Sequence, residues 1–267
     1  MKFVHSFWTA PSMTARYGYK CEQLFYNLWY FALSCAYAKR SGADIVLHTD
    51  TLGKLLFGHL PYDKIYTTLD DIKAPPRFWA AGKFYSLEKE TLDSIHIDGD
   101  VFIKSPKLVE RMFNSNSDLL VQYEEPWVDT VTRDRLRKHF SMDYFDHKQM
   151  YNTGVLGIFN QELKNEILAT YFKSIEKGRR LPDYLLGDSN FTPDLVCEQQ
   201  MIAHKSQGYE VDFILKNVYN CTKEANKIGY QHVLSSAKYA QIDICKNTLK
   251  KIDNKLYLNT LKICQTL

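Results

Sequence analysis

The stretch at residues 94–103 reads S-I-H-I-D-G-D-V-F-I and places two carboxylates between apolar runs. The apolar runs predict a strand over Ser94–Ile97 that delivers Asp98 at its end. In an extended chain, residues i and i+2 point to the same side, so Asp98 and Asp100 can face one cation. Between them, Gly99 has no side chain and would let the phosphates of a ligand approach the backbone. Carboxylates beside phosphate oxygens suit Mg²⁺ or Mn²⁺, and we predict such a site here.

The segment before this stretch has the pattern of a parallel α/β sheet. Lys2–Trp8 is predicted to be a strand, Glu22–Lys39 a helix with an apolar stripe, and Asp44–His48 a second strand. Strand, helix and strand with short connections open a right-handed parallel sheet, and such sheets bind ligands at the ends of their strands. Further predictions are strands at Asp63–Thr67, Asp118–Tyr123 and Val155–Phe159, helices at Phe78–Leu87, Leu163–Lys177 and Val196–Gln207, and loops at Thr9–Tyr19 and Glu124–Met150.

Length and charge limit the possible classes of protein. The chain has 267 residues, of which 45% are hydrophobic, enough for a full core. A net charge of only +3 argues against a nucleic-acid binder that works through bulk charge. We predict a catalytic domain over residues 1–221 and a C-terminal segment over residues 222–267. Lys246–Leu267 is predicted to be one basic amphipathic helix, packed on the core or docked on an anionic membrane.

The expected location is the cytoplasm, with the inner face of the membrane as a possible docking place. The six cysteines form no C-x-x-C pair, which favours free buried thiols. The first residues lack the apolar stretch of a signal peptide, and no segment approaches the ~20 apolar residues of a membrane helix.

Three other interpretations of the carboxylate pair were weighed. A calcium loop needs more oxygen ligands, and the apolar residues after Asp100 exclude it. An Asp-Gly surface turn is a plain structural alternative. The run I-D-G-D-V also resembles the first motif of haloacid-dehalogenase-type phosphatases, in which Asp98 would be the nucleophile and Gly187-Asp188…Asp194 the late acidic motif. That motif normally ends the first strand of its domain, whereas strand–helix–strand units precede Asp98.

Three further stretches, together with I-D-G-D-V, resemble GT-A-fold glycosyltransferases. Tyr151-Asn152-Thr153-Gly154-Val155 is similar to F-N-[AS]-G-V, Glu198-Gln199-Gln200 to D-Q-D, and Gln231-His232-Val233…Lys238 keeps the His-x₅-Lys spacing of H-x-x-G-x-x-K. The blocks stand in family order, especially that of the retaining glycogenin-like and lipopolysaccharide-galactosyltransferase-like families. The chain also resembles an uncharacterised bacterial group with an S-F-W start and H-I-D-G-D-V-F.

The resemblance implies a fold, a reaction and a set of site residues. The fold would be a GT-A, Rossmann-like α/β fold with a mixed, mainly parallel sheet flanked by helices. The enzyme would be a metal-dependent hexosyltransferase of polysaccharide biosynthesis that uses a nucleotide-sugar donor, with UDP favoured, and a glycan or lipid-linked acceptor, and retains configuration. Its metal ligands would be Asp98, Asp100 and His232, its donor contacts Asn152, Gly154 and Lys238, and its catalytic residues Glu198, Gln199 and Lys238.

Two points stay open at the level of sequence. Lys83, on the predicted helix before the carboxylate pair, is as consistent with a solvent-facing lysine as with a donor contact. The chain departs from the family pattern at Gln200, where the second acid of D-Q-D would stand, and at Ser235, where the late glycine would stand. A non-catalytic nucleotide-sugar binder therefore remains a third functional hypothesis beside the transferase and the phosphatase.

Overall fold

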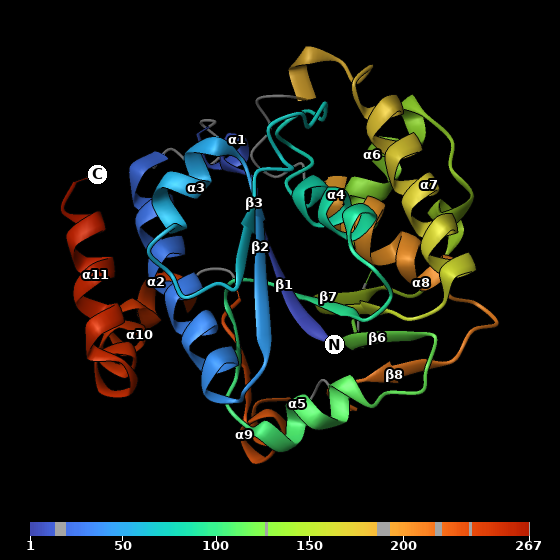
Figure 1. The fold of residues 1–267 in the computed structure, drawn as a ribbon. Helices are drawn as coiled ribbons and strands as arrows, with labels where there is room; N and C mark the ends of the chain where they lie inside the picture. The colour runs from blue at the N-terminus through green and yellow to red at the C-terminus, as the bar shows by residue number, and fades with distance from the viewer. Residues whose placement is uncertain (14–19, 126–127, 186–192, 217–220, 235–236, 267) are drawn as a thin grey trace.

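The computed structural model describes residues 1–13, 20–125, 128–185, 193–216, 221–234 and 237–266. The strands of its main sheet are β1 (Lys2–Phe7), β2 (Asp44–Thr49), β3 (Lys64–Tyr66), β4 (Ser94–Ile97), β6 (Leu119–Glu124), β7 (Tyr151–Ile158) and β8 (Val211–Phe213). Across the described residues these strands lie in the order β3-β2-β1-β4-β7-β6-β8, with helices on both sides of the sheet (Figure 1). The predicted α/β class, a mixed sheet flanked by helices, is confirmed.

The sheet is mainly parallel, and one strand runs against its neighbours. β1 pairs in parallel with β2 and β4, β2 with β3, and β6 with β8. Among the described strands of this main sheet, only β7 is antiparallel, to both β4 and β6. Every residue of β2 after Asp44 is buried, as expected for a parallel strand covered on both faces. Because parallel strands share a direction, β1, β2 and β4 end at one edge of the sheet, where Asp98 follows β4.

Some of the helices begin or end at residues with capping chemistry. They are α1 (Thr9–Met13), α2 (Lys20–Arg40), α3 (Thr51–Phe57), α4 (Ala81–Lys89), α5 (Pro106–Phe113), α6 (Thr130–His139), α7 (Gln161–Gly178), α8 (Met201–Lys205), α9 (Cys221–Ile228), α10 (Ala237–Ile252) and α11 (Asn254–Cys264). Asp50 caps α3 by accepting a hydrogen bond from the Gly53 amide, and Asn160 caps α7 in the same way. After α2, Gly42 has a φ of 78°, which lets the chain turn into β2.

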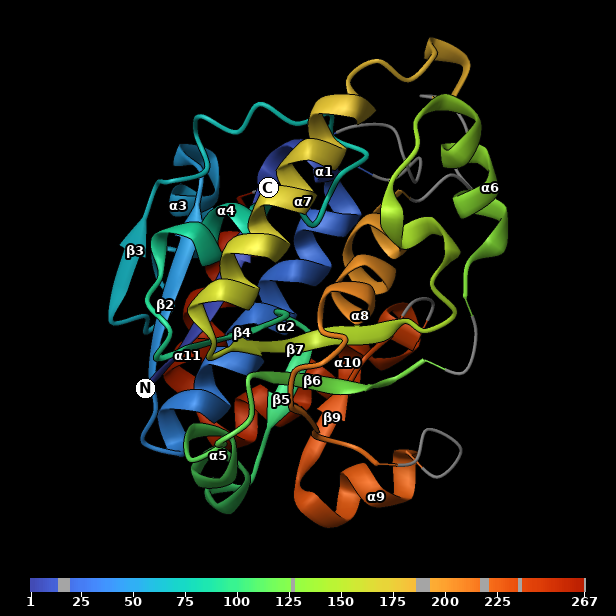
Figure 2. The same ribbon diagram turned by 90° about the vertical axis from the view of Figure 1, so that its right-hand side faces the viewer.

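A second, two-stranded sheet joins the middle of the chain to its C-terminal part. β5 (Val101–Ile103) pairs antiparallel with β9 (Tyr230–His232), and Val101 lies opposite His232 (Figure 2). β5 begins directly after Asp100. The pairing therefore brings the late histidine to the carboxylate pair.

The C-terminal helices pack against α2 and differ from the predicted single helix. The sequence predicted one helix over Lys246–Leu267, but α10 ends at Ile252, and Asp253 starts α11 by accepting a hydrogen bond from the Leu256 amide. The local cap interrupts the amphipathic pattern. α10 and α11 lie beside α2 (Figure 1), and Leu249 and Leu256 are buried in one cluster with residues of α2. Docking on a membrane and the division between residues 221 and 222 both stay predictions.

Two predicted loops contain helices. Thr9–Tyr19 includes α1, and residues 14–19 lie outside the described part of the chain. Glu124–Met150 contains α6 and the 3₁₀ turn Asp143–Asp146. No apolar stripe marks α6 in the sequence, because its residues are mostly charged and only Thr132 and Leu136 are buried. β7 also begins at Tyr151, earlier than the predicted Val155.

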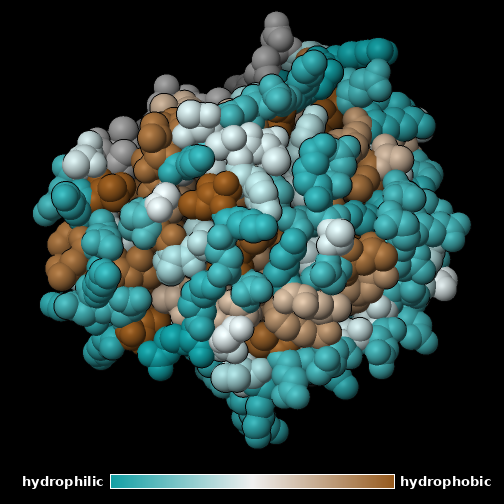
Figure 3. All heavy atoms as spheres, in the orientation of Figure 1, coloured by the Kyte–Doolittle hydropathy of each residue, from teal (hydrophilic) through white to brown (hydrophobic). Residues whose placement is uncertain are grey.

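The surface is mostly polar, and the cysteines whose side chains the structure describes are free thiols. Polar side chains cover most of the face in Figure 3, with apolar side chains in separate groups. None of the helices within the described ranges has the length and apolar character that crossing a bilayer requires. Cys35, Cys197 and Cys245 are buried free thiols, and Cys264 is a half-buried one.

Candidate functional site

Three predicted metal ligands converge at the edge of the sheet. Asp98 follows β4, Asp100 precedes β5, and His232 ends β9. One possible ligand atom from each residue lies within 4.8 Å of those of the other two. Asp100 and His232 have largely buried side chains, whereas Asp98 is a quarter exposed. Two carboxylates and an imidazole form a donor set that suits a divalent cation such as Mn²⁺ or Mg²⁺.

Backbone pairing holds this cluster together. The Val233 amide donates to the Asp100 carbonyl at 3.1 Å, next to the paired Val101 and His232. The Asp98 amide donates to the Gly154 carbonyl of β7 at 2.9 Å. Both carboxylates are thus placed by strands that come from distant parts of the sequence.

Lys83 of α4 lies inside the site and not in solvent. Its Nζ is 3.1 Å from Asp98 Oδ1 and 2.6 Å from Glu198 Oε1, and it donates to the Thr153 carbonyl at 2.9 Å. The side chain is only 3% exposed, so the solvent-facing interpretation is wrong. Burial by itself would lower the pKa of Lys83, but the two carboxylates raise it above its usual value. The lysine therefore stays charged between Asp98 and Glu198.

Glu198 and Gln199 lie on a π-helical turn, Leu195–Gln200, where a regular helix was predicted. π-helical turns are rare and frequently occur at functional sites. Glu198 is buried and accepts from the Thr153 hydroxyl at 2.6 Å as well as from Lys83. Burial and the nearby Asp98 raise the pKa of Glu198, although Lys83 acts against them. Gln199 is half-buried on the same turn.

Asn152 and Gly154 lie within strand β7, so neither belongs to a turn. Asn152 accepts from the Gly154 amide at 3.1 Å and donates to Glu125 Oε1 at 2.9 Å. A Cβ at Gly154 would lie 2.5 Å from a ring carbon of His232 and 2.6 Å from Gln122 Oε1. A glycine is therefore needed here for the histidine to approach β7.

Lys238 of α10 contacts the second carboxylate. Its Nζ is 2.5 Å from Asp100 Oδ2, and its carbonyl accepts from the Tyr30 hydroxyl at 2.5 Å. Burial would raise the pKa of Asp100, but Lys238 and His232 hold it well below its usual range. Asp100 therefore stays ionised.

Packing against Phe31 also explains why a glycine stands at position 99, in addition to the predicted phosphate contact. A Cβ at Gly99 would lie 2.0 Å from the ring of Phe31, on α2. The absent side chain gives space to this aromatic ring. Approach of phosphates to the Gly99 backbone stays a prediction.

Several site residues were missed by the sequence analysis. Gln122 Oε1 lies 2.7 Å from His232 Nδ1, and Glu125, whose pKa is raised by burial, bonds to Asn152. His96 Nδ1 lies 3.7 Å from Asp98 Oδ1, and its Nε2 lies 2.8 Å from Ser6 Oγ. A polar Gln122 in the otherwise apolar run L-L-V-Q-Y could have been noticed, because buried polar groups need a partner.

The residues of the phosphatase interpretation are placed differently. Asp98 follows β4, the fourth strand along the chain. Asp194 is buried and accepts from the Ala80 amide at 3.0 Å and the Tyr171 hydroxyl at 2.9 Å. Both of its oxygens therefore have protein partners at the start of α4 and on α7. Gly187 and Asp188 lie outside the described residues, as does Ser235.

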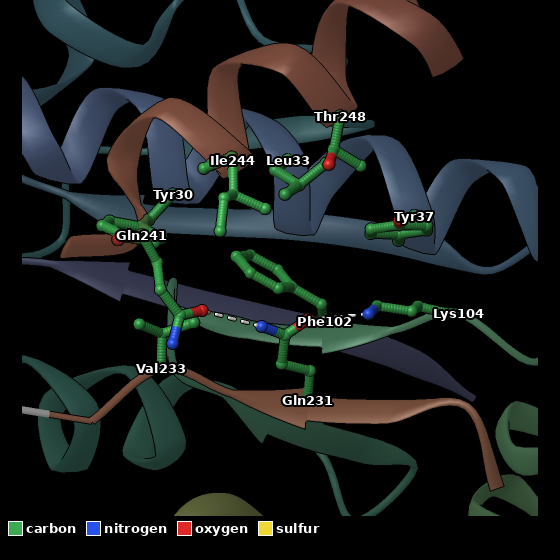
Figure 4. Close-up of a pocket in the computed structure, with 11 residues that line it drawn as sticks. Tyr30, Leu33, Tyr37, Phe102, Lys104, Gln231, Val233, Gln241, Ile244 and Thr248 are labelled. Carbon is green, nitrogen blue, oxygen red and sulfur yellow. Dashed lines mark hydrogen bonds between the residues drawn. The ribbon is translucent and has the colours of Figure 1, made fainter. Parts of the chain in front are cut away.

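A separate cavity of about 120 Å³ lies behind the two-stranded sheet (Figure 4). Phe102 of β5 and Gln231 of β9 point into it, and Gln231 bonds to both Lys104 and Gln241. Tyr30 and Val233 also line it. The cavity shares strands β5 and β9 with the metal cluster but none of its side chains.

Comparisons with known proteins establish the family. The model of a family of unknown function, DUF6734, matches residues 1–262, so the chain belongs to that family. No curated protein matches the chain. Among solved structures, it is similar to the galactosyltransferase LgtC in complex with donor and acceptor sugar analogues, with a TM-score of 0.41 and 11% identity over 80% of this chain and 73% of that one.

Proposed function

We propose that this member of DUF6734 is a metal-dependent GT-A glycosyltransferase that moves a hexose from a nucleotide-sugar, preferably a UDP-sugar, to a glycan or glycolipid acceptor with retention of configuration. The observation that carries the proposal is the convergence of Asp98, Asp100 and His232 at the end of β4. We further propose that it works in the cytoplasm, with residues 1–221 as the catalytic domain.

The donor set fits Mn²⁺ or Mg²⁺. Asp98, Asp100 and His232 would hold the ion, and the nearby cations Lys83 and Lys238 limit the excess of negative charge. When bound, the ion would supply a Lewis acid that stabilises the charge on the leaving diphosphate. His232 would bind as neutral imidazole.

Lys238 would serve the leaving group. Its side chain is 37% exposed and reaches Asp100 from a helix, so it can turn to a diphosphate bound beside the carboxylate. Negative charge on the leaving oxygen grows in the transition state, and a fixed ammonium beside it lowers the barrier. Lys83, held between Asp98 and Glu198, would keep these carboxylates in place and is a further candidate for donor contacts.

The sugar would lie against β7 and the π-helical turn. Asn152 and Gly154 would contact it from β7, and Glu198 and Gln199 would lie below its reacting carbon. The acceptor hydroxyl oxygen forms a bond to C1, and the bond from C1 to the diphosphate oxygen breaks. The bonding electron pair stays on the diphosphate, which takes the proton of the hydroxyl group.

A thermal-shift panel of nucleotide-sugars, with and without Mn²⁺, tests the proposal. We expect a UDP-sugar to stabilise the protein only when the metal is present, because Asp98, Asp100 and His232 would hold the ion whose charge favours binding of the diphosphate. Stabilisation without metal would favour a non-catalytic binder. No stabilisation by any nucleotide-sugar would overturn the assignment. Product analysis with the best donor and a panel of acceptor sugars would then identify the transfer.

A further inference from the structure

The ring of His232 has a defined partner on the side away from the carboxylates. Its Nδ1 lies 2.7 Å from Gln122 Oε1, and its Nε2 lies 3.4 Å from Asp100 Oδ1. Gln122 sits on β6 and is 2% exposed. An amide oxygen only accepts hydrogen bonds, so this contact requires the proton on Nδ1. In its neutral form, the ring then presents the lone pair of Nε2 toward Asp100.

Gly154 makes this contact possible. A Cβ there would lie 2.6 Å from Gln122 Oε1 and 2.7 Å from His232 Nδ1, the two atoms that form the hydrogen bond. β7 runs between β4 and β6, and the ring and the amide meet at Gly154 on this strand. Any larger residue would separate them.

We propose that Gln122 and Gly154 act as positioning residues that hold His232 in one orientation and one tautomer, with Nε2 ready to bind the metal. The proposal rests on the proposed metal site and deepens it. Ligand histidines commonly donate their other ring nitrogen to a fixed acceptor, which sets the tautomer and the ring plane. Without the acceptor, the ring can rotate or carry its proton on Nε2, and in either state it presents no lone pair to the cation.

The test measures Mn²⁺ binding to the donor-free protein by the loss of the free-ion electron paramagnetic resonance signal. Gln122→Met keeps the length of the side chain and removes the acceptor, and we expect affinity to fall ~10–100-fold. Gln122→Glu restores an acceptor and should return affinity close to that of the wild type. Gly154→Ala should also weaken binding, because its methyl group displaces the same pair.

Tyr144→Phe is the matched control. It removes a buried hydroxyl that hydrogen-bonds with Ser174 Oγ at 2.8 Å and donates to Cys197 Sγ at 3.3 Å, and neither partner is a proposed metal ligand. We expect it to leave Mn²⁺ affinity unchanged even if the melting temperature falls. This separates a positioning effect from a general loss of packing.

Pulsed electron paramagnetic resonance at saturating Mn²⁺ gives a second measurement, the coupling between the ion and nearby nitrogen atoms. The wild type should show coupling of the ion to an imidazole nitrogen, and Gln122→Met should lose or weaken it. Wild-type affinity and coupling in both Gln122→Met and Gly154→Ala would overturn the inference alone. Failure of the wild type to bind Mn²⁺ would overturn the metal site and the inference with it. If Gln122→Met does not fold, Gly154→Ala and the rescue by Gln122→Glu decide the matter.

Discussion

The two carboxylates of the D-G-D run stand in different surroundings. Asp98 lies beside the buried Lys83 and Glu198, and all three residues come from the part of the chain before residue 222. Asp100 pairs with His232 and Lys238, which the C-terminal segment brings in through β9 and α10. Lys83 and Glu198 are almost fully buried beside Asp98, which is itself a quarter exposed, whereas Lys238 beside Asp100 is 37% exposed. We infer that the Asp98 group is rigid and that the Asp100 group can rearrange when the donor binds.

Removing either carboxylate should have the largest effect. Asp98→Ala and Asp100→Ala should each abolish metal-dependent nucleotide binding, because both groups supply a ligand to one cation. Calorimetric titration with a nucleoside diphosphate and Mn²⁺ measures this, and circular dichroism checks that the fold is kept. Normal binding by either variant would show that the two groups do not share an ion.

Replacing each of the two lysines by methionine should lower the free energy of unfolding by different amounts. Lys83→Met leaves Glu198 buried without its ammonium partner and should lower the free energy of unfolding by about 3–5 kcal/mol. Lys238→Met removes a partly exposed ammonium and leaves Asp100 with His232 as a partner, so the loss should be smaller than at Lys83. Urea denaturation gives both values. Lys164→Met, at a buried lysine that donates to a backbone carbonyl, is the control for loss of a buried ammonium. Equal losses at Lys83 and Lys238 would contradict the comparison.

The pH dependence of stability should have opposite signs at Glu198 and Asp100 in the metal-free protein. Burial raises the pKa of Glu198, so its stabilising contribution is present below the unfolded pKa of about 4.3 and is lost as the pH rises through the folded pKa. Lys238 and His232 lower the pKa of Asp100 against burial, so its contribution is present above about 3.9 and is lost as the pH falls.

Urea denaturation of Glu198→Gln and Asp100→Asn between about pH 7 and about pH 3 tests these signs. Relative to Glu198→Gln, the wild type should gain stability on acidification through the raised pKa of Glu198. Relative to Asp100→Asn, it should lose stability at the acid end of the range. If the stability difference between the wild type and each variant changed with pH in the same direction for both, the pKa values of the two carboxylates would not be shifted in opposite directions.

For the last prediction we expect no effect at all: Asp98 should not become phosphorylated. The phosphatase alternative requires Asp98 as a nucleophile, and beryllofluoride with Mg²⁺ would then trap an acyl-phosphate mimic. We expect mass spectrometry after incubation with phosphate esters to find no phosphorylated Asp98, because its Oδ1 faces Lys83. A phosphorylated Asp98 would replace the proposed reaction with the hydrolase.

Local patterns were enough to predict much of the main sheet. β4 coincides with the predicted Ser94–Ile97, and α2 and β2 differ from their predicted ranges by a residue or two. The pattern of apolar residues within a short stretch of sequence predicts such strands and helices directly. α6 lacks an apolar stripe, and the break at Asp253 depends on one side-chain hydrogen bond, so both escaped prediction.

The sequence alone predicted that Asp98 and Asp100 could face one ligand, but its reason, an extended chain with residues i and i+2 on the same side, is wrong. Gly99 and Asp100 form a turn in which the Val101 amide donates to the Asp98 carbonyl at 3.0 Å. A family resemblance, and not a local rule, named His232. Only the tertiary structure decided that Lys83 is buried against Glu198, that Gln122 meets His232, and that Gly154 leaves room for both. These contacts join residues on different strands and helices. Their distances depend on strand pairing and side-chain volume, which no short window of sequence contains.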